Sequence, residues 1–201
     1  MKILLTRHGE TEENVEGILT KGESNKITKR GYGQIGRLIS RLKEEKIDMI
    51  ISSDLVRCKL TAENIGKKIK VPIEYSRYLR EKDMGDFVGM AQKEIDWDGL
   101  EGSFEERRAP NGENLNEVRV RGREFFSQLL KRKDLKDKTI LVVSHGAFLK
   151  VFIGDLLRMN LYDSIFKLSI ENASLTELDI EESYKEGYQI KTINEKSYLK
   201  K

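Results

Sequence analysis

The sequence has 201 residues, of which 38% are hydrophobic and 35% charged, and its net charge is +3. We expect residues 1–201 to form one domain, and the near balance of charge excludes a strongly basic nucleic-acid-binding protein. The longest apolar run, Ile140–Val143, is too short to cross a bilayer, and the N-terminus is too short and polar for a signal peptide. The single cysteine, Cys58, favours a reducing compartment. We therefore expect a cytoplasmic protein that binds neither nucleic acid nor membrane.

The hydrophobic pattern alternates short apolar strands with amphipathic helices. Strands are predicted at Lys2–Thr6, Asp48–Ser52, Ile73–Tyr75, Thr139–Ser144, Ala173–Ile180 and Tyr188–Asn194, the last two forming a hairpin. Helices are predicted at Thr28–Lys43, Leu55–Lys67, Glu113–Arg132 and Ala147–Met159. Asp54 is a candidate N-cap for the second of these helices. The alternation predicts an α/β fold, a three-layer α/β/α sandwich around a mainly parallel central sheet.

The only two histidines of the chain follow matching buried strands. His8 ends the run KILLTRHG, and His145 ends the run TILVVSHG. Ligands of an open parallel sheet bind beyond the carboxyl ends of its strands, so we expect both histidines to face one site. A hydrogen-bonded loop histidine without a chemical role is the alternative for each of them taken singly.

Two arginines stand at strand ends beside these histidines. Arg7 directly precedes His8, and Arg57 follows the apolar run that ends near Ser52. A guanidinium group matches the geometry of a phosphate and stays charged at any working pH. The pair therefore suggests a bound phosphoryl group, although Arg57 taken alone is more simply interpreted as a solvated helix residue.

Four ordered motifs together resemble those of the histidine phosphatase superfamily, also called the phosphoglycerate mutase-like family. R-H-G-E-T-x-x-N spans Arg7–Asn14, and S-S-D-L-x-R-x-x-x-T-A-E spans Ser52–Glu63. L-R-E-x-x-x-G spans Leu79–Gly85, and V-S-H-G spans Val143–Gly146. The resemblance covers nearly the whole chain in the family's order, and it implies one histidine phosphatase domain over residues 1–201.

The resemblance also implies roles for individual residues. His8 would be the nucleophile that takes the phosphoryl group, and Glu81 would be the general acid. The phosphoryl group would be held and neutralised by Arg7, Asn14, Arg57 and His145. Phosphoryl transfer needs mainly positioning and charge stabilisation, so this set needs no metal and no cofactor. The expected partner is a small-molecule phosphate ester; the sequence leaves the oligomeric state open, a homodimer included.

Several competing interpretations fail on context. Gly31, Gly33 and Gly36 spell G-x-G-x-x-G, but no strand precedes them, so a dinucleotide site is not expected. Cys58 lacks the arginine six residues later that a cysteine-dependent phosphatase would need. The two histidines lack metal-ligand spacing. The basic runs Arg119–Arg123 and Lys131–Lys138 are interpreted as the solvated face and end of a helix.

The family resemblance leaves the reaction open between two fates of a phosphohistidine. The segment between Glu81 and His145 is short for a phosphoglycerate mutase, and L-R-E-K-D-M-G-D-F-V-G resembles the phosphatase branch. We therefore expect a metal-independent phosphomonoester hydrolase, with a 2,3-bisphosphoglycerate-dependent phosphoglycerate mutase as the alternative. A phospho-ligand-binding module without activity is a third option. Substrate choice is expected to lie in the loop-like segments Lys21–Lys26 and Phe87–Asn111.

Overall fold

A single mixed sheet forms the centre of the molecule. The computed structural model describes residues 1–20 and 26–200, so most of the predicted rim segment Lys21–Lys26 lies outside the described residues. Six strands pair in the order β3-β2-β4-β1-β5-β6. They are β1 (Lys2–Arg7), β2 (Met49–Ser53), β3 (Ile73–Ser76), β4 (Thr139–Ser144), β5 (Leu175–Ile180) and β6 (Tyr188–Glu195). The first four are mutually parallel, and β5 is antiparallel to β1 and β6, which confirms the mainly parallel sheet and the terminal hairpin.

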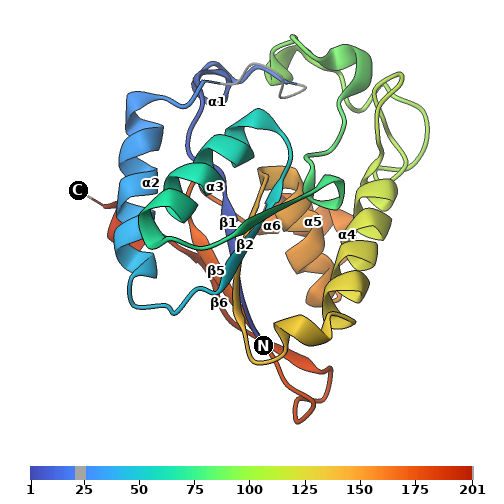
Figure 1. Ribbon diagram of the computed structural model, residues 1–201. Coiled ribbons are helices and arrows are strands. Elements are labelled where there is room, and N and C mark those ends of the chain that lie inside the picture. Colours follow the sequence, from blue (N-terminus) through green and yellow to red (C-terminus); the bar gives the residue numbers. More distant parts are fainter. Residues whose placement is uncertain (21–25, 201) are drawn as a thin grey trace.

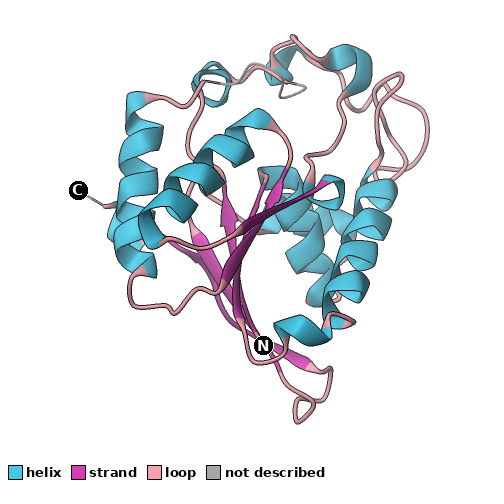
Figure 2. Cartoon of the chain, viewed as in Figure 1, coloured by secondary structure: helices cyan, strands magenta, loops and turns pink. Residues whose placement is uncertain are grey.

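Helices cover both faces of this sheet, as the sequence predicts (Figures 1 and 2). One face carries α2 and α3, and the other carries α4, α5 and α6. The α-helices are α1 (Glu12–Glu16), α2 (Lys29–Leu42), α3 (Val56–Ile69), α4 (Leu115–Leu130), α5 (Gly146–Leu156) and α6 (Leu161–Lys167). None of the helices in the described ranges 1–20 and 26–200 has both the length and the apolar character needed to cross a bilayer.

Two separate hydrophobic cores follow from the alternation of side chains along the strands. Ile3 and Leu5 of β1 pack with residues of α4 and α5, whereas Leu4 between them packs with residues of α2 and α3. The same alternation divides β4, where Ile140 faces the first core and Leu141 the second. Strands that are apolar on both faces belong to a sheet with helices on both sides, which explains their continuous hydrophobic runs.

Helix ends follow local capping, with one correction to the prediction. Thr28 caps α2, where its side chain accepts the Gly31 amide. The predicted N-cap Asp54 of α3 is wrong: the N-cap residue is Leu55, without a side-chain cap. Asp54 instead accepts two hydrogen bonds from the Arg80 guanidinium, at 2.7 and 2.5 Å. Because both oxygens of the Asp54 carboxylate are engaged in this bidentate ion pair, the carboxylate does not cap α3.

Two short helices escape the prediction, and one predicted helix is too long. The five residues of α1 are too few for a periodic pattern, and a capping box between Thr11 and Asn14 holds them instead. The other short helix, α6, is capped by Asn160. The predicted helix Ala147–Met159 ends at Leu156, because Arg158 adopts a left-handed backbone with φ 58°.

The segment between Leu79 and α4 lies over the carboxyl ends of the strands (Figure 1, green). Its regular structure is limited to the 3-10 turns η2 (Gly85–Phe87) and η3 (Gln92–Glu94), which agrees with the predicted non-periodic insertion. The two ends of the segment meet at Gly85, where a Cβ atom would lie 2.0 Å from the Pro110 carbonyl oxygen. The insertion is thus closed on itself above the sheet.

Replacement of Gly154 by alanine should destabilise the contact between α5 and α6. An added Cβ would lie 2.0 Å from the Ser164 Oγ and 2.5 Å from its Cβ. We expect a loss of about 1–3 kcal/mol in the free energy of unfolding, measured by urea denaturation. Gly36→Ala in α2 is the matched control, since a Cβ added there would meet no neighbouring group within 4 Å. That variant should gain about 0.5–1 kcal/mol; equal changes in both variants would contradict the packing argument.

Candidate active site

The parallel pairing of β1 with β4 brings the two histidines together. His8 follows β1 and His145 follows β4, and the His8 amide donates to the Ser144 carbonyl oxygen at 3.0 Å. Their ring centroids lie 5.3 Å apart at 61°. Both side chains are almost fully buried. The structure therefore places the two histidines in one site at the carboxyl edge of the sheet, where the sequence predicts them.

The hydrogen bonds of His8 fix which ring nitrogen carries the proton. Nδ1 lies 2.8 Å from the Gly9 carbonyl oxygen, and a carbonyl only accepts, so Nδ1 is the donor. Nε2 accepts from Arg57 Nε at 3.2 Å. Burial, together with the charges of Arg57 and Arg7, holds the pKa of His8 well below its usual range. His8 is thus a neutral imidazole with an unprotonated Nε2 beside a guanidinium.

His145 is fully buried beside His8 and is surrounded by polar side chains. Its Nε2 is 2.8 Å from the Ser53 Oγ and 3.3 Å from the Cys58 Sγ. Burial, followed by the charge of Arg57, lowers its pKa well below the usual range. Burial also raises the pKa of the Cys58 thiol, which donates to the Ser144 carbonyl oxygen at 3.4 Å. Cys58 is therefore a protonated packing residue, as expected of a chain that does not use a cysteine nucleophile.

Arg7 offers the site a buried donor. Its Nη1 donates to the Ile170 carbonyl oxygen at 3.0 Å, whereas its Nε is buried and has no hydrogen-bond partner among the described residues. The guanidinium lies against Gly146, where a Cβ would be 3.3 Å from the Arg7 Cζ. Nearly all buried donors in proteins have a hydrogen-bond partner, so a buried N–H of this kind marks a place for an acceptor such as a phosphate oxygen.

Asn14 of α1 is held at the site by Asn172, a partner that the sequence does not reveal. Its Oδ1 accepts the Thr11 amide at 3.3 Å and the Asn172 Nδ2 at 3.1 Å. Asn172 also donates to the His8 carbonyl oxygen at 3.0 Å. Because the Asn14 Oδ1 already accepts two hydrogen bonds, the side-chain Nδ2 of Asn14 is the atom that can donate to a ligand.

Glu81 is held against the start of α5. One carboxylate oxygen accepts the amides of Lys82 and Phe148, at 3.0 and 2.9 Å. The other oxygen accepts the Ala147 amide at 3.1 Å. The first amides of a helix have no partner within it, and His145 at the N-cap position supplies no side-chain hydrogen bond. Glu81 therefore supplies the cap of α5 from a distant part of the chain and borders the same cavity as His8.

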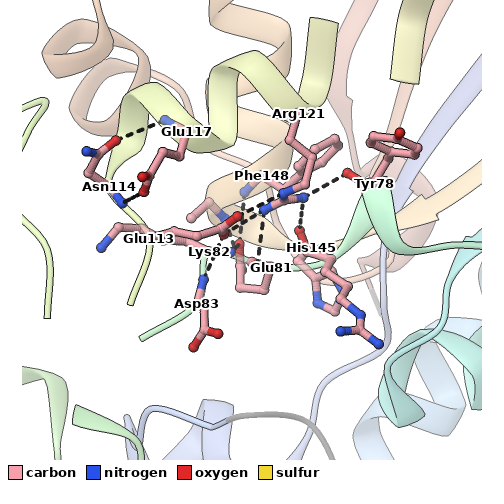
Figure 3. A network of polar contacts seen from close by, with 12 residues as sticks. Tyr78, Glu81, Lys82, Asp83, Glu113, Asn114, Glu117, Arg121, His145 and Phe148 are labelled. Carbon is pink, nitrogen blue, oxygen red and sulfur yellow. Dashed lines mark hydrogen bonds and ion pairs between the residues drawn. The ribbon is translucent and has the colours of Figure 1, made fainter. Parts of the chain in front are cut away.

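Arg121 of α4 fixes the backbone around Glu81 (Figure 3). Its Nη1 donates to the carbonyl oxygens of Tyr78 and Arg80 at 2.7 and 2.8 Å. Its Nη2 donates to the Glu81 carbonyl at 3.4 Å and to a Glu113 carboxylate oxygen at 2.8 Å. The interpretation of Arg119–Arg123 as a solvated face is wrong for Arg121, whose guanidinium binds Glu113 and three carbonyl oxygens about 40 positions earlier in the chain.

A cavity of about 460 Å³ is bordered by Arg7, His8, Asn14, Arg57 and Glu81, whereas His145 and Arg121 are not among its described lining residues. Three cationic side chains of the described residues border the cavity: Arg7, Arg57 and Lys150. Lys150, which the sequence does not single out, donates from Nζ to the Ile165 carbonyl oxygen at 2.8 Å, and burial lowers its pKa. Within residues 1–20 and 26–200, no group of three histidine, cysteine or acidic side chains could hold a metal ion. The cavity can thus receive a dianionic group on cations and amide donors of the chain itself.

The model of the histidine phosphatase superfamily (branch 1) matches residues 3–196 of this chain. The chain belongs to that superfamily. The predicted resemblance and the predicted class of enzyme, a phosphomonoesterase, are therefore confirmed at the level of the family.

Curated and solved relatives of this histidine phosphatase extend over its full length. A probable phosphoglycerate mutase GpmB of Salmonella choleraesuis is 28% identical over 207 residues, covering 99% of this chain and 95% of the relative. Bacillus stearothermophilus YhfR superposes with a TM-score of 0.87 at 24% identity, covering 99% of each chain. A phosphoserine phosphatase mutant of Entamoeba histolytica, solved with phosphoserine, gives 0.84 at 25% identity over 98% of each chain. These likenesses confirm the α/β fold.

The buried histidines of this histidine phosphatase should stay neutral well below the pH at which free histidine titrates. The pKa values of both are lowered, so below about pH 6.5 the unfolded chain binds protons that the folded chain does not. The free energy of unfolding should then fall as pH falls below about 6.5, by up to about 1.4 kcal/mol per pH unit for each histidine.

Histidine ring NMR measures this directly, since the chain has two histidines. We expect two neutral ring signals at pH 6.5, that of His8 with its proton on Nδ1. The double variant His8→Gln, His145→Gln is the control for the unfolding experiment and should lose the histidine part of the pH slope. A ring that titrates with a midpoint at or above pH 6.5 would contradict the assignment.

Proposed function

We propose that the chain hydrolyses phosphomonoesters without a metal, through a phosphohistidine formed on His8. The observation that carries the proposal is the unprotonated Nε2 of His8, which accepts from Arg57 Nε at 3.2 Å. A nitrogen lone pair at this position can attack phosphorus only while the ring stays neutral, and burial keeps it so. The buried Nε of Arg7 supports a phosphoryl oxygen as its missing partner.

In the first step, the His8 Nε2 forms a bond to phosphorus as the bond between phosphorus and the alcohol oxygen breaks. A proton moves from the Glu81 carboxyl group to the leaving oxygen, so a neutral alcohol departs. The phosphoryl oxygens take up donors from Arg7, Asn14, Arg57 and His145. The Arg57 Nε–H moves from the His8 Nε2 to a phosphoryl oxygen, which frees the Nε2 lone pair for the attack. Arg7 and Asn14 keep the contacts to Ile170 and Asn172 that hold them in place.

In the second step, water takes the place of the alcohol. The Glu81 carboxylate accepts a proton from the water, the water oxygen bonds to phosphorus, and the bond to His8 Nε2 breaks. Inorganic phosphate leaves, and the proton gained by Glu81 restores the starting state. The contacts of Glu81 with three amides keep its carboxyl at the same place in both steps.

A phosphoglycerate mutase is the second candidate, because the curated relatives carry that name. The two reactions share the first step and differ in whether water or a sugar acid receives the phosphoryl group. The segment between Glu81 and His145 is short for a phosphoglycerate mutase, and this supports transfer of the phosphoryl group to water. The free thiol of Cys58 supports a reducing compartment, and we propose the cytoplasm as the location.

Phosphorus NMR of the metal-stripped enzyme tests the reaction. With an aryl phosphate we expect inorganic phosphate to accumulate without added metal. With 3-phosphoglycerate and catalytic 2,3-bisphosphoglycerate, we expect little 2-phosphoglycerate. His8→Ala should lower turnover by on the order of 10³-fold or more, because the variant lacks the nitrogen that forms the bond to phosphorus. Unchanged turnover in His8→Ala would refute the nucleophile, and a dominant 2-phosphoglycerate signal would establish the mutase.

Glu81→Gln tests the general acid. The amide cannot supply a proton, so hydrolysis of an alkyl phosphate should fall by about 10²-fold or more. An activated ester such as 4-nitrophenyl phosphate, whose leaving group needs no proton, should lose less than about tenfold in its phosphorylation step. Pre-steady-state release of nitrophenol isolates that step. Equal losses for both esters would indicate that Glu81 only caps α5.

A further inference from the structure

A second hollow of about 500 Å³ adjoins the phosphate cavity, and we call it the aromatic chamber. It lies between the insertion above the sheet and helix α6. Most of its wall is apolar or aromatic. The wall residues used below are Met84, Trp97, Phe104, Tyr162, Ile165 and Phe166.

The aromatic chamber and the phosphate cavity are adjacent. They share Met84, Gln92, Ala147 and Ile165 as wall residues. Ala147 is also the residue whose amide donates to the Glu81 carboxylate at 3.1 Å. The proposed proton donor Glu81 borders the phosphate cavity and is hydrogen-bonded to Ala147, a residue that borders both hollows.

The chamber walls are aromatic rings held by neighbouring groups. Trp97 is flanked by the Phe87 ring at 5.7 Å and by the Lys82 ammonium at 4.8 Å from its centroid. The centroid of the Phe104 ring lies 5.2 Å from that of Tyr162. Phe166 completes this group, with its centroid 4.7 Å from that of Tyr162. Rings in such mutual contact form a preorganised apolar surface.

Two rings of this surface remain open to solvent. Tyr162 is 53% exposed and Phe166 is 63% exposed. Large exposed apolar side chains that gather beside a reactive centre are typical of a ligand-binding surface. A neighbouring hollow beside Glu81 has more charged residues in its walls, and these include two ion pairs, Arg80 with Asp54 and Arg121 with Glu113. The aromatic chamber is therefore the neighbouring hollow whose exposed apolar surface a ligand can bury.

We propose that the aromatic chamber binds the alcohol part of the substrate, and that this part carries a flat aromatic ring system. The inference rests on the proposed phosphatase function, which it deepens by naming a substrate class. The phosphate lies against His8, the ester oxygen faces Glu81, and the ring system lies against Tyr162 and Phe166. Apolar ring surface, rather than a second charged group, then selects the substrate.

Trp97 allows a direct binding test, because it is the only tryptophan of the chain. The probe is 4-nitrobenzylphosphonate, an unhydrolysable analogue whose nitroaromatic ring quenches indole fluorescence. We expect saturable quenching of Trp97, with an affinity at least about tenfold above that of methylphosphonate. Inorganic phosphate should compete with the probe but should cause little quenching alone. Equal affinities for the two phosphonates would overturn the inference.

Variants separate the chamber from the phosphate site. Tyr162→Ala and Phe166→Ala remove exposed rings, and Tyr32→Ala is the matched control, an exposed aromatic of α2 that does not border the chamber. The substrates are phenyl and 2-naphthyl phosphate, whose leaving phenols have similar acidity. We expect the wild type to favour the naphthyl ester in kcat/KM by about tenfold. The two chamber variants should bring that ratio close to one, and the control should keep it.

The outcomes distinguish this inference from the function on which it rests. If neither ester is hydrolysed, the proposed function fails, and the phosphonate titration still decides whether the chamber binds an aromatic ring. If both esters are hydrolysed but the variants lower both rates equally, the chamber inference fails and the function stands. Sedimentation in which Phe166→Ala splits a dimer, with unchanged phosphonate binding, would assign the surface to a second copy of the chain and overturn the inference.

Discussion

The pairing of β1 with β4 is the constraint on which the site depends. In their parallel register Arg7 lies opposite Ser144, so the residues that follow, His8 and His145, must emerge side by side. The amide of His8 continues the ladder to the Ser144 carbonyl oxygen at 3.0 Å. A shift by one residue would turn a histidine into the opposite face of the sheet. The hydrophobic alternation of both strands, each buried on two faces, fixes the register and therefore the geometry of the reacting groups.

Burial gives this geometry its electrostatic character. The site encloses two imidazoles whose pKa values are lowered and two guanidinium groups that stay charged. The low pKa of His8 follows from the same burial that makes each hydrogen bond to an anion stronger. An arriving phosphate would therefore satisfy the buried Nε of Arg7 and offset the repulsion between the cations. The free site is a set of donors arranged for an acceptor that the chain itself does not supply.

The sequence predicts those features of the fold and the site that are determined by residues close together in the chain. The strand ends, both histidines and the arginines beside them follow from local patterns, because strand polarity decides where such residues meet. Residues that act across the chain are different: Arg121 fixes Glu81 through carbonyl oxygens about 40 positions away, and Asn172 joins Asn14 to His8. No periodicity marks such contacts. The same long-range competition explains the failed cap, because Arg80 draws Asp54 away from α3.

Glu81 connects the proposed chemistry with the proposed choice of substrate. Its carboxylate caps α5 through the amides of Ala147 and Phe148, and Ala147 borders both hollows. A group that must hand a proton to the leaving oxygen thus has its position set by the helix that also forms the chamber wall. Because α6 packs against α5, the rings of Tyr162 and Phe166 are carried by a helix in contact with the helix that Glu81 caps. Changes on α6 can then alter which alcohol is accommodated while the groups that transfer the phosphoryl group stay in place.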